Sequence, residues 1–369
     1  MIDWQKTCLI SPGDVAPSRG DFVVIGTFNP GAVRIGDTVH LLVRIAEQPV
    51  APEDKRTIAL PRYDGDGKLH VDYLATDVVD PIDARVVLDR RTGAARLTSV
   101  SYLRHFTVPI DRIDRPDAYV DTGNQFLPSA ATETMGVEDP RITTIDRRHY
   151  LTYVSVSGHG ACTSMAVTDD FRTFDRCGIQ FPNENKDVVI LPERINDRWV
   201  AIHRPVSATP FGPPEMWTAI SADGRSWGHH HPMQFVGTSA AGEWSNGRVG
   251  AGTVPVRCHP DDGVHANHPG GWVSLFHGNT RSADLGEVGR YCGALMVGHA
   301  DDPGRIVATS PGPVFLPDQP FETEGFVPGV VFPTAWIELD DRVAIFYGAA
   351  DQHTAVAITD RRALLATAN

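Results

Sequence analysis

The sequence predicts an all-β protein, and within that class a five-bladed β-propeller with a central active-site funnel, formed by a single domain over residues 1–369. Helix signals are scarce, whereas short alternating or β-branched runs bounded by Gly, Pro, Asn and Asp recur from end to end. The 34 Gly and 28 Pro are spread evenly, which predicts frequent turns and no linker between domains. An approximate internal repeat favours a propeller over a sandwich.

The repeat consists of two strand types that follow one another. The first type recurs as Tyr150–Val154, Trp199–His203, Trp272–His277 and Val343–Tyr347. The second type follows each of these, as Met165–Asp169, Trp217–Ser221, Ala294–Gly298 and Ala355–Thr359. The period is irregular, at roughly 50 to 75 residues, which is the size of a propeller blade with its loops. Adding Val39–Arg44 brings the count of predicted blades to five.

Several first-type strands end in residues that suit a binding site, namely Arg44, His203 with Arg204, His277 and Tyr347. Five sheets arranged radially leave only short edges and bring these strand ends together around one funnel. In a sandwich, the same ends would scatter over two rims. Residues 51–110 are the least regular stretch and are expected only as blade and loop.

Composition and charge disfavour several classes of partner. Acidic residues outnumber basic ones by 46 to 33, and the net charge of -13 repels nucleic acid and anionic membranes. The five cysteines are scattered without a Cys-x-x-Cys pair, so we expect them to be reduced. No signal peptide and no run of about 18 apolar residues is apparent, so we expect a cytoplasmic protein.

Residues 136–141 read Gly-Val-Glu-Asp-Pro-Arg and contain the candidate catalytic acid. An Asp-Pro step is commonly only a turn. Asp139, however, stands beside the second carboxylate of Glu138, and partial burial would raise its pKa toward the range that suits a general acid. Arg141, two residues further on in an extended chain, would hold a substrate oxygen or orient Asp139.

Two cationic residues, Lys186 and Arg204, follow this motif. Lys186 alone could be a surface charge paired with Asp187, and His277 could be a hydrogen-bonded core histidine. Arg204 directly follows an apolar strand, and an arginine at a buried strand end needs an anionic partner. An arginine fork together with a lysine point charge makes a reasonable phosphate clamp, to which His277 would add a donor.

Neither a metal site nor a cofactor is expected. Three adjacent imidazoles in His229–His231 cannot all face one ion, and no acidic partner follows at ligand spacing, so a solvated loop is favoured there. The sequence contains no Gly-rich phosphate loop, serine nucleophile elbow or dinucleotide-binding fingerprint, and Gly250–Gly252 is too short to count as one. A nucleotide cofactor is therefore not expected, and inorganic phosphate is expected as a co-substrate because of the cationic residues Lys186 and Arg204.

Taken together, these residues resemble glycoside hydrolase family 130, the β-mannoside phosphorylases and related mannosidases. Any one motif is weak, but the ordered set is highly specific and spans nearly the whole chain. The matching stretches are Phe28–Gly31, Leu41–Arg44, Gly136–Ile142, Asn185–Glu193, His203–Pro205, Arg248–Gly252, Gly271–Gly278, Phe315–Pro317 with Phe321–Glu322, and Tyr347–Asp351.

The resemblance implies a five-bladed propeller and an inverting reaction, in which phosphate attacks the anomeric carbon of a terminal β-mannoside and α-mannose 1-phosphate is released. Asp139 matches the family's general acid, which acts through the mannosyl 3-hydroxyl. Lys186, Arg204 and His277 match the phosphate-binding positions. The residues expected to bind the sugar substrate are Asn29, Arg44, Glu138, Arg141, Arg248 and Asp351.

Two alternatives stay open. One is a β-mannosidase on the same scaffold, with water as nucleophile and Glu243 or Glu324 as base; hydrolytic members lose the cationic cluster that this chain retains. The other is a non-catalytic propeller that binds glycans. The family's Ser-x-Leu-Arg step is present at Ser101–Arg104, but the step that usually follows is not recognisable in His105–Pro109. Linkage, acceptor sugar and oligomeric state, a homo-oligomer included, are therefore left open.

Overall fold

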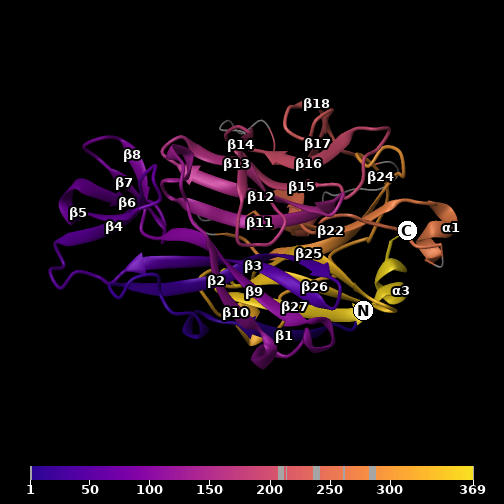
Figure 1. Cartoon of the computed structure of the whole chain (residues 1–369), viewed down its shortest axis with the longest axis horizontal. Helices are drawn as coiled ribbons and strands as arrows, with labels where there is room; N and C mark the ends of the chain where they lie inside the picture. The colour runs from indigo at the N-terminus through magenta and orange to yellow at the C-terminus, as the bar shows by residue number, and fades with distance from the viewer. Residues whose placement is uncertain are drawn as a thin grey trace.

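A computed structural model describes residues 2–206, 212, 214–235, 242–260, 262–281 and 288–368. The α-helices in this part of the chain are short, and strands make up most of its regular structure (Figure 1). These helices are α1 (Gly263–Asn267), α2 (Pro320–Thr323) and α3 (Arg361–Leu365). The predicted all-β class is therefore confirmed. No helix among the described residues is long and apolar enough to cross a membrane.

The strands form sheets in which most neighbours pair antiparallel. The first sheet contains β2 (Phe22–Ile35), β3 (Thr38–Pro49), β9 (Val100–Pro109), β10 (Val120–Phe126), β11 (Gly136–Ile145), β12 (Arg148–Ser157), β13 (Gly160–Thr168) and β14 (Asp175–Phe181). The second contains β15 (Asn185–Ile190), β16 (Trp199–Pro205), β17 (Trp217–Ser221) and β18 (Trp227–Pro232).

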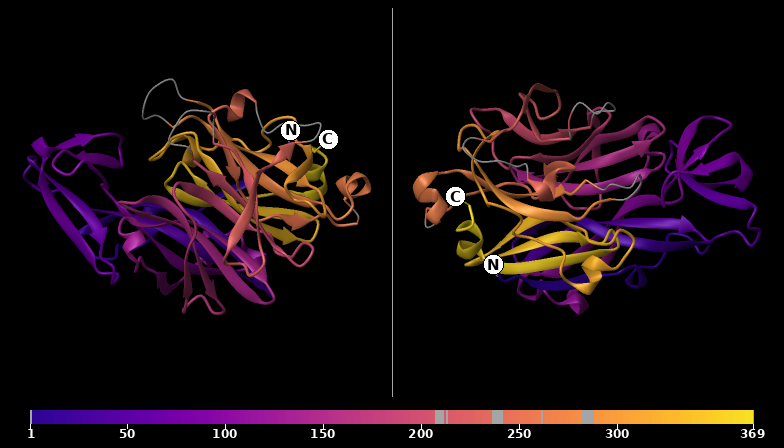
Figure 2. Two further views of the ribbon diagram at one scale, coloured as in Figure 1. Left: turned by 90° about the horizontal axis from the view of Figure 1, so that it is seen from above. Right: turned by 180° about the vertical axis from the view of Figure 1, so that it is seen from behind.

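Two further large sheets follow along the chain. One contains β19 (Gln234–Phe235), β20 (Arg248–Ala251), β21 (Val256–Arg257), β22 (Trp272–Asn279), β23 (Tyr291–Gly298) and β24 (Arg305–Thr309). The other contains β25 (Val331–Leu339), β26 (Arg342–Ala349), β27 (His353–Asp360) and the N-terminal strand β1 (Gln5–Ile10). Within these sheets, β9 with β11 and β19 with β24 pair parallel. Because β1 pairs with β27, the two ends of the described chain meet in one sheet (Figure 2).

The predicted repeat of two strand types is confirmed. The first-type segments lie in β12, β16, β22 and β26, and each pairs antiparallel with the second-type segment that follows, in β13, β17, β23 and β27. The eight-stranded sheet divides into two groups of four, because β9 and β11 meet only at a single parallel bridge between Ser101 and Gly136. The larger sheets of the described chain therefore contain five groups of mainly antiparallel strands.

Hydrophobic clusters lie between successive groups, and one of them joins the last group to the first. In chain order, these clusters contain Leu42 with Leu151, Met165 with Trp199, Ile202 with Phe276, Leu275 with Ile345, and Phe346 with Leu41. This cyclic order of packing is the one that a five-bladed propeller requires. Closure into a propeller, and its formation by one domain, stay predictions.

A separate insertion lies between β3 and β9. It consists of a hairpin, β4 (Thr57–Tyr63) with β5 (Leu69–Ala75), and a small sheet of β6 (Val79–Pro81), β7 (Val86–Asp89) and β8 (Ala94–Leu97). These strands pair only with one another and project at one end of the molecule (Figures 1 and 2). For the part of residues 51–110 that precedes β9, the expectation of blade and loop is therefore wrong. Residues in that part, such as Leu60 and Val87, form a small core of their own.

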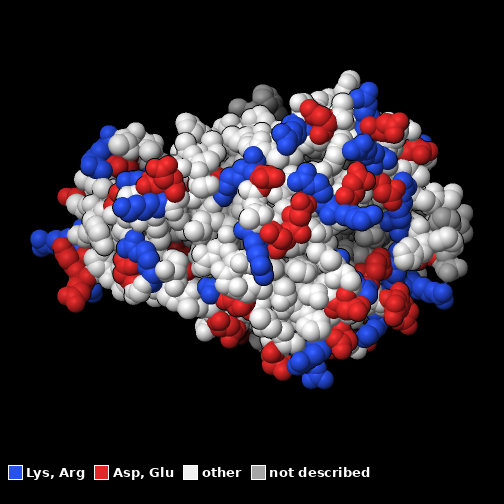
Figure 3. Space-filling view, in the orientation of Figure 1, with Lys and Arg blue, Asp and Glu red and all other residues white. Residues whose placement is uncertain are grey.

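Two further features concern the distribution of surface charge and the state of the cysteines. On the face shown in Figure 3, acidic and basic side chains are interspersed rather than gathered into the basic strip that a nucleic-acid backbone would need. All five cysteines are unpaired, and Cys162, Cys258 and Cys292 are buried.

Candidate active site

A cavity of about 110 Å³ lies where strand ends from all five groups and the insertion come together. We call it the inner cavity. Every predicted site residue lines it except Arg141 and His277. The lining residues are Asn29, Arg44, Arg85, Glu138, Asp139, Lys186, Asp187, Arg204, Arg248, Val288, Tyr291, Val330, Phe332 and Asp351. Residues far apart in the sequence thus meet in one place, as the predicted funnel requires.

A shared backbone conformation directs several side chains toward the cavity. Asn29, Asp139, Asp187 and Asp351 all have positive φ, at 49°, 50°, 56° and 49°. This left-handed region is uncommon for residues other than glycine, and Asn and Asp tolerate it best. The first three residues lie at register shifts in β2, β11 and β15. Such bulges change the direction in which a side chain points.

Two glycines make room for these side chains. A Cβ on Gly348 would collide with the side-chain oxygen of Asn29, and a Cβ on Gly250 would collide with a carboxylate oxygen of Asp187. The inward side chains therefore depend on glycines from a neighbouring sheet group.

Arg44, on β3, holds the carboxylate pair of β11. Its Nη1 donates to Asp139 Oδ1 at 3.0 Å, its Nη2 donates to Glu138 Oε1 at 2.7 Å, and its Nε donates to Ser101 Oγ at 3.1 Å. Asn29 Nδ2 also donates to Asp139 Oδ1, at 2.8 Å. Among the described residues, the hydrogen bonds to this carboxylate all go to Oδ1. The second oxygen, Oδ2, is left for a ligand.

The structure corrects the expectation that Asp139 has a raised pKa. Burial does raise the pKa of Asp139, but the charges of Arg44, Lys186 and Arg141 and the hydrogen bond from Asn29 together lower it to below its ordinary value. The expectation considered only burial and Glu138, because the cations that approach from other strands are not visible in the motif itself. Asp139 is therefore ionised in the unliganded protein at neutral pH.

Asp187 forms a second cluster with Arg204 and His277. Its Oδ2 accepts a hydrogen bond from Arg204 Nε at 2.7 Å and lies 3.1 Å from His277 Nε2. Burial raises the pKa of Asp187, but the charge of Arg204 and the hydrogen bond from His277 lower it to well below the ordinary value. Burial also lowers the pKa of His277, so we assign a neutral imidazole that carries its proton on Nε2 and donates it to Asp187.

Lys186 does not pair with Asp187, and the alternative considered from the sequence is wrong on this point. Its Nζ lies 4.0 Å from Glu138 Oε2 instead. The carboxylate of Asp187 is turned to Arg204 and His277. The two cations Lys186 and Arg204 line the same cavity as Asp139.

Arg204 also has an unsatisfied donor. Its Nη1 is buried and has no hydrogen-bond partner among the described residues. A buried donor without an acceptor is costly, and an anionic ligand would remove that cost. Together with the 32% exposed side chain of Lys186, Arg204 offers a site for a small anion.

Arg141 and His277 lie behind the cavity wall. Arg141 Nε donates to Gly252 O at 2.7 Å and its Nη1 donates to Asp139 O at 3.2 Å, so Arg141 supports the backbone of Asp139, which is one of the two roles predicted for it. His277 is fully buried, and its Nε2 is occupied by Asp187. Arg141 Nη2 and His277 Nδ1 are buried and have no hydrogen-bond partner among the described residues, so a direct contact of either residue with a ligand stays a prediction.

Several lining residues were missed by sequence reasoning. Arg85 belongs to no motif and enters from the loop between β6 and β7. Tyr291 and Phe332 are buried lining residues that look like ordinary strand residues in the sequence. Burial raises the pKa of Asp351, and Arg85 is the strongest of the charges that oppose this shift. Among the lining residues that were missed, only Asp187 had a signal in the sequence, because it directly follows the predicted site residue Lys186.

Other candidate residues have no place at the cavity. His229–His231 lies in β18 and not in a loop, and His230 Nδ1 is 3.1 Å from the buried His203 Nε2. Glu243 and Glu324 are exposed, and neither lines the cavity. Within the described ranges, no group of His, Cys, Asp and Glu side chains is arranged to hold a metal ion.

Comparisons with known proteins agree with the sequence motifs. The model of glycoside hydrolase family 130, described as beta-1,4-mannooligosaccharide phosphorylase, matches residues 82–368. The chain is 32% identical to the beta-1,2-mannobiose phosphorylase of Listeria innocua over 361 residues, which cover 94% of this chain and 92% of that protein. It is 30% identical to the beta-1,4-mannooligosaccharide phosphorylase of Ruminococcus albus over 225 residues, which cover 60% of this chain and 62% of that protein.

The fold comparison leads to the same family. The solved structure of the Listeria innocua enzyme in complex with beta-1,2-mannobiose superposes with a TM-score of 0.84 at 31% identity, covering 97% of this chain and 96% of that one. The chain therefore belongs to glycoside hydrolase family 130 and is an enzyme of the glycoside phosphorylase class.

Proposed function

We propose that this enzyme catalyses the inverting phosphorolysis of a terminal β-mannoside and releases α-mannose 1-phosphate. The observation that carries the proposal is that Asp139, with Oδ2 free among the described residues, lines the same cavity as the cations Lys186 and Arg204. An inverting reaction needs one acid and a nucleophile on the opposite face of the sugar. Here bound phosphate takes the place of a base-activated water.

Lys186 and Arg204 bind the phosphate in this proposal. Arg204 contributes its unsatisfied Nη1, and Lys186 contributes a point charge. His277 acts one step further back, since it hydrogen-bonds Asp187, which in turn fixes Arg204 Nε. This differs from the expectation of direct contact between His277 and phosphate, and makes His277 a positioning residue.

Asp139 supplies the proton. A phosphate oxygen forms a bond to the anomeric carbon while the bond from that carbon to the glycosidic oxygen breaks. The proton of Asp139 Oδ2 passes to the mannosyl 3-hydroxyl, and the proton of that hydroxyl passes to the leaving oxygen, as the family resemblance implies. Attack from the face opposite the leaving group turns a β-linkage into an α-phosphate.

Phosphate binding also prepares Asp139 for this role. Lys186 is one of the charges that lower the pKa of Asp139 in the unliganded protein. A phosphate dianion beside Lys186 offsets that charge and adds a negative charge nearby, and both effects favour the protonated carboxyl group. Asp139 thus gains its proton in the complex, where the reaction uses it.

The mannosyl unit is held by the remaining predicted residues that line the cavity, which are Asn29, Arg44, Glu138, Arg248 and Asp351.

We further propose a five-bladed propeller, a cytoplasmic location and a short manno-disaccharide or oligosaccharide as substrate. The unpaired cysteines suit a reducing compartment. A β-1,2 linkage is the first to test, because the Listeria innocua relative that aligns with 94% of the chain is named for it; β-1,4-linked mannosides and mannosyl-glucose are the next.

Hydrolysis is the weaker alternative. Glu243 and Glu324, the two carboxylates considered as its base, are exposed and do not line the cavity. A non-catalytic glycan-binding role is overturned by membership of an enzyme family.

The test is incubation of the purified protein with β-1,2- and β-1,4-linked mannobiose, with and without inorganic phosphate, followed by assay of mannose 1-phosphate and free mannose. We expect the sugar phosphate to form only when phosphate is added. Free mannose at equal rates in both tubes would identify a hydrolase and remove the roles given to Lys186 and Arg204.

A further inference from the structure

A second cavity, which we call the outer cavity, adjoins the inner one. It has a volume of about 370 Å³ and shares Arg85 and Val288 with the inner cavity. This size falls within the range of small-molecule pockets, roughly 300 to 1,000 Å³. Its other lining residues are Asp83, Ala84, Phe326, Val327 and Pro328. Arg85 therefore stands at the junction, where a ligand that extends out of the inner cavity would pass.

The insertion fixes the position of Arg85. Asp83 Oδ1 accepts hydrogen bonds from the backbone nitrogens of Arg85 at 2.7 Å and Val86 at 2.9 Å. The backbone oxygen of Arg85 accepts a hydrogen bond from the nitrogen of Thr98 at 2.8 Å. The small sheet of β6, β7 and β8, which lies outside the five sheet groups (Figure 1), thus holds the backbone of a residue that lines both cavities.

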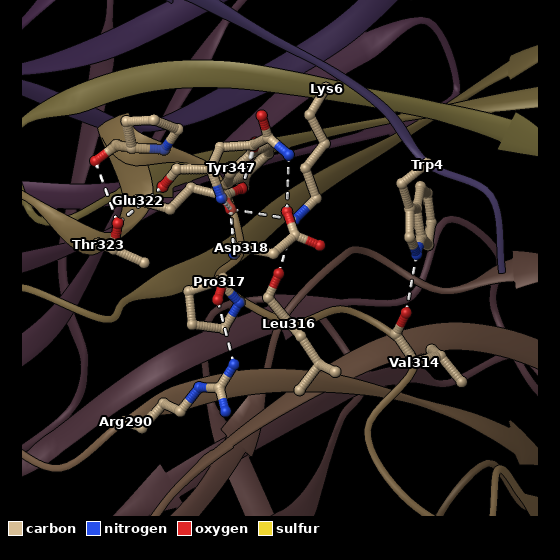
Figure 4. Close-up of polar contacts among 12 residues, drawn as sticks. Trp4, Lys6, Arg290, Val314, Leu316, Pro317, Asp318, Glu322, Thr323 and Tyr347 are labelled. Carbon is tan, nitrogen blue, oxygen red and sulfur yellow. Dashed lines mark hydrogen bonds and ion pairs between the residues drawn. The ribbon is translucent and has the colours of Figure 1, made fainter. Parts of the chain in front are cut away.

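The second wall is formed by Phe326, Val327 and Pro328. It is held by a hydrogen bond from Val327 N to Ala350 O at 2.9 Å and by contacts of Glu322. The backbone oxygen of Glu322 accepts a hydrogen bond from Gly329 N at 2.9 Å. Its buried carboxylate accepts hydrogen bonds from Tyr347 Oη at 2.7 Å and Lys6 Nζ at 3.1 Å (Figure 4). Both walls of the outer cavity are therefore anchored before any ligand binds, which reduces the entropy lost on binding.

The chemistry of the walls matches a neutral sugar. Phe326 is half-buried and offers an apolar ring face, and Arg85 offers several N–H donors in a planar fork. A pyranose presents the matching surfaces, with C–H groups on one face and hydroxyl acceptors at its rim. The carboxylates of Asp83 and Asp351 near Arg85 disfavour a second anion there.

We propose that the outer cavity binds the sugar that leaves in phosphorolysis, with Arg85 as the specificity-determining contact to its hydroxyls and Phe326 as the ring on which it packs. This inference rests on the proposed function. It assigns the substrate as a disaccharide or longer mannoside whose second unit is an uncharged sugar, and it gives the insertion a role in selecting that unit.

The test runs the reaction in reverse, with α-mannose 1-phosphate as donor and mannose as acceptor, on the full-length protein and the variants Phe326→Ala and Arg85→Ala. We expect the KM for mannose to rise by about 10- to 100-fold. The KM for the sugar phosphate should change by less than about twofold in Phe326→Ala, because Phe326 lines only the outer cavity. Arg85 lines both cavities, so Phe326→Ala gives the cleaner result.

Arg90→Ala is the matched control. Arg90 lies in the same insertion, is exposed and pairs with Asp80 at 3.4 Å, away from both cavities. It should leave both KM values unchanged. If wild-type protein is active but both Phe326→Ala and Arg85→Ala keep the wild-type KM for mannose, the outer cavity is not the acceptor subsite. Wild-type protein that forms no mannose 1-phosphate from any mannoside would instead contradict the proposed function itself.

Discussion

Asp139 and Asp187 occupy matching places in neighbouring sheet groups, yet their surroundings differ. Both have a left-handed backbone, with φ of 50° and 56°, and both lie at register shifts. In both, nearby cations lower the pKa below its ordinary value despite burial. The side chain of Asp139, however, is 11% exposed, whereas that of Asp187 is 2% exposed.

The difference lies in where the hydrogen bonds go. Those to Asp139 reach only Oδ1 among the described residues, so Oδ2 faces no protein donor. Asp187 has its Oδ2 shared between Arg204 and His277. The same left-handed backbone conformation therefore supports two different roles. At Asp139 it presents a carboxylate that is available for proton transfer, and at Asp187 it presents a carboxylate that is a structural anchor. The neighbouring side chains, and not the bulge, decide which role results.

Asp139→Asn should give the largest effect on activity. General acid catalysis is worth about 10²- to 10⁴-fold, so phosphorolysis should slow by that factor. The amide can still accept the hydrogen bonds from Arg44 and Asn29, so thermal unfolding should stay close to that of the wild type. The measurement is kcat/KM with mannobiose and phosphate, next to a melting curve. A variant that is folded and nearly as active as the wild type would exclude Asp139 as the acid.

Asp187→Ala should give the largest effect on stability. Removing one partner of a buried ion pair leaves the other charge uncompensated and costs about 3–5 kcal/mol. Denaturant unfolding of Asp187→Ala should show such a loss in the free energy of unfolding. Asp187→Asn is the matched control, since it keeps the size and one acceptor oxygen and should lose less. If Asp187→Ala unfolds like the wild type, the anchoring role is wrong.

The comparison also shows how far the sequence can be interpreted. The all-β class and the paired strand types are visible because strand periodicity and turn residues are local signals. Asp139, Lys186 and Arg204 stand in motifs, so their convergence was predictable. The pKa direction of Asp139 was not, because it depends on Arg44 and Asn29, which lie about a hundred residues away in the chain. Arg85 had no signal, because its role depends on how the insertion folds back.

Lys186→Met should separate phosphate binding from stability. Losing a hydrogen bond to a charged group costs about 1.5–3 kcal/mol, so the KM for phosphate should rise by about 10- to 100-fold. The free energy of unfolding should change by less than about 1 kcal/mol, because the partly exposed Lys186 has only a long contact with Glu138. Initial rates over a range of phosphate concentrations provide the measurement, and Lys186→Arg should restore part of the affinity. An unchanged KM for phosphate would place the clamp elsewhere.

The smallest expected effect is a pH dependence that belongs to the Asp187 cluster alone. Burial lowers the pKa of His277, although Asp187 acts in the opposite direction. A histidine whose pKa is lowered by folding binds fewer protons folded than unfolded, so its contribution to stability is lost as the pH falls below about 6.5. Between pH 7.5 and 5.5, the wild type should lose more stability than His277→Gln, which has no titrating group at that position. Urea unfolding at both pH values measures this difference.

Asp139→Asn provides the contrast in the same experiment. Folding lowers the pKa of Asp139 below its ordinary value of about 3.9, so Asp139 does not titrate between pH 5.5 and 7.5 in either state. This variant should keep the wild-type pH dependence while losing activity, and His277→Gln should lose part of the pH dependence. Equal pH dependence in the wild type and His277→Gln would mean that folding does not lower the pKa of His277, which would contradict its assignment as an imidazole held neutral by burial.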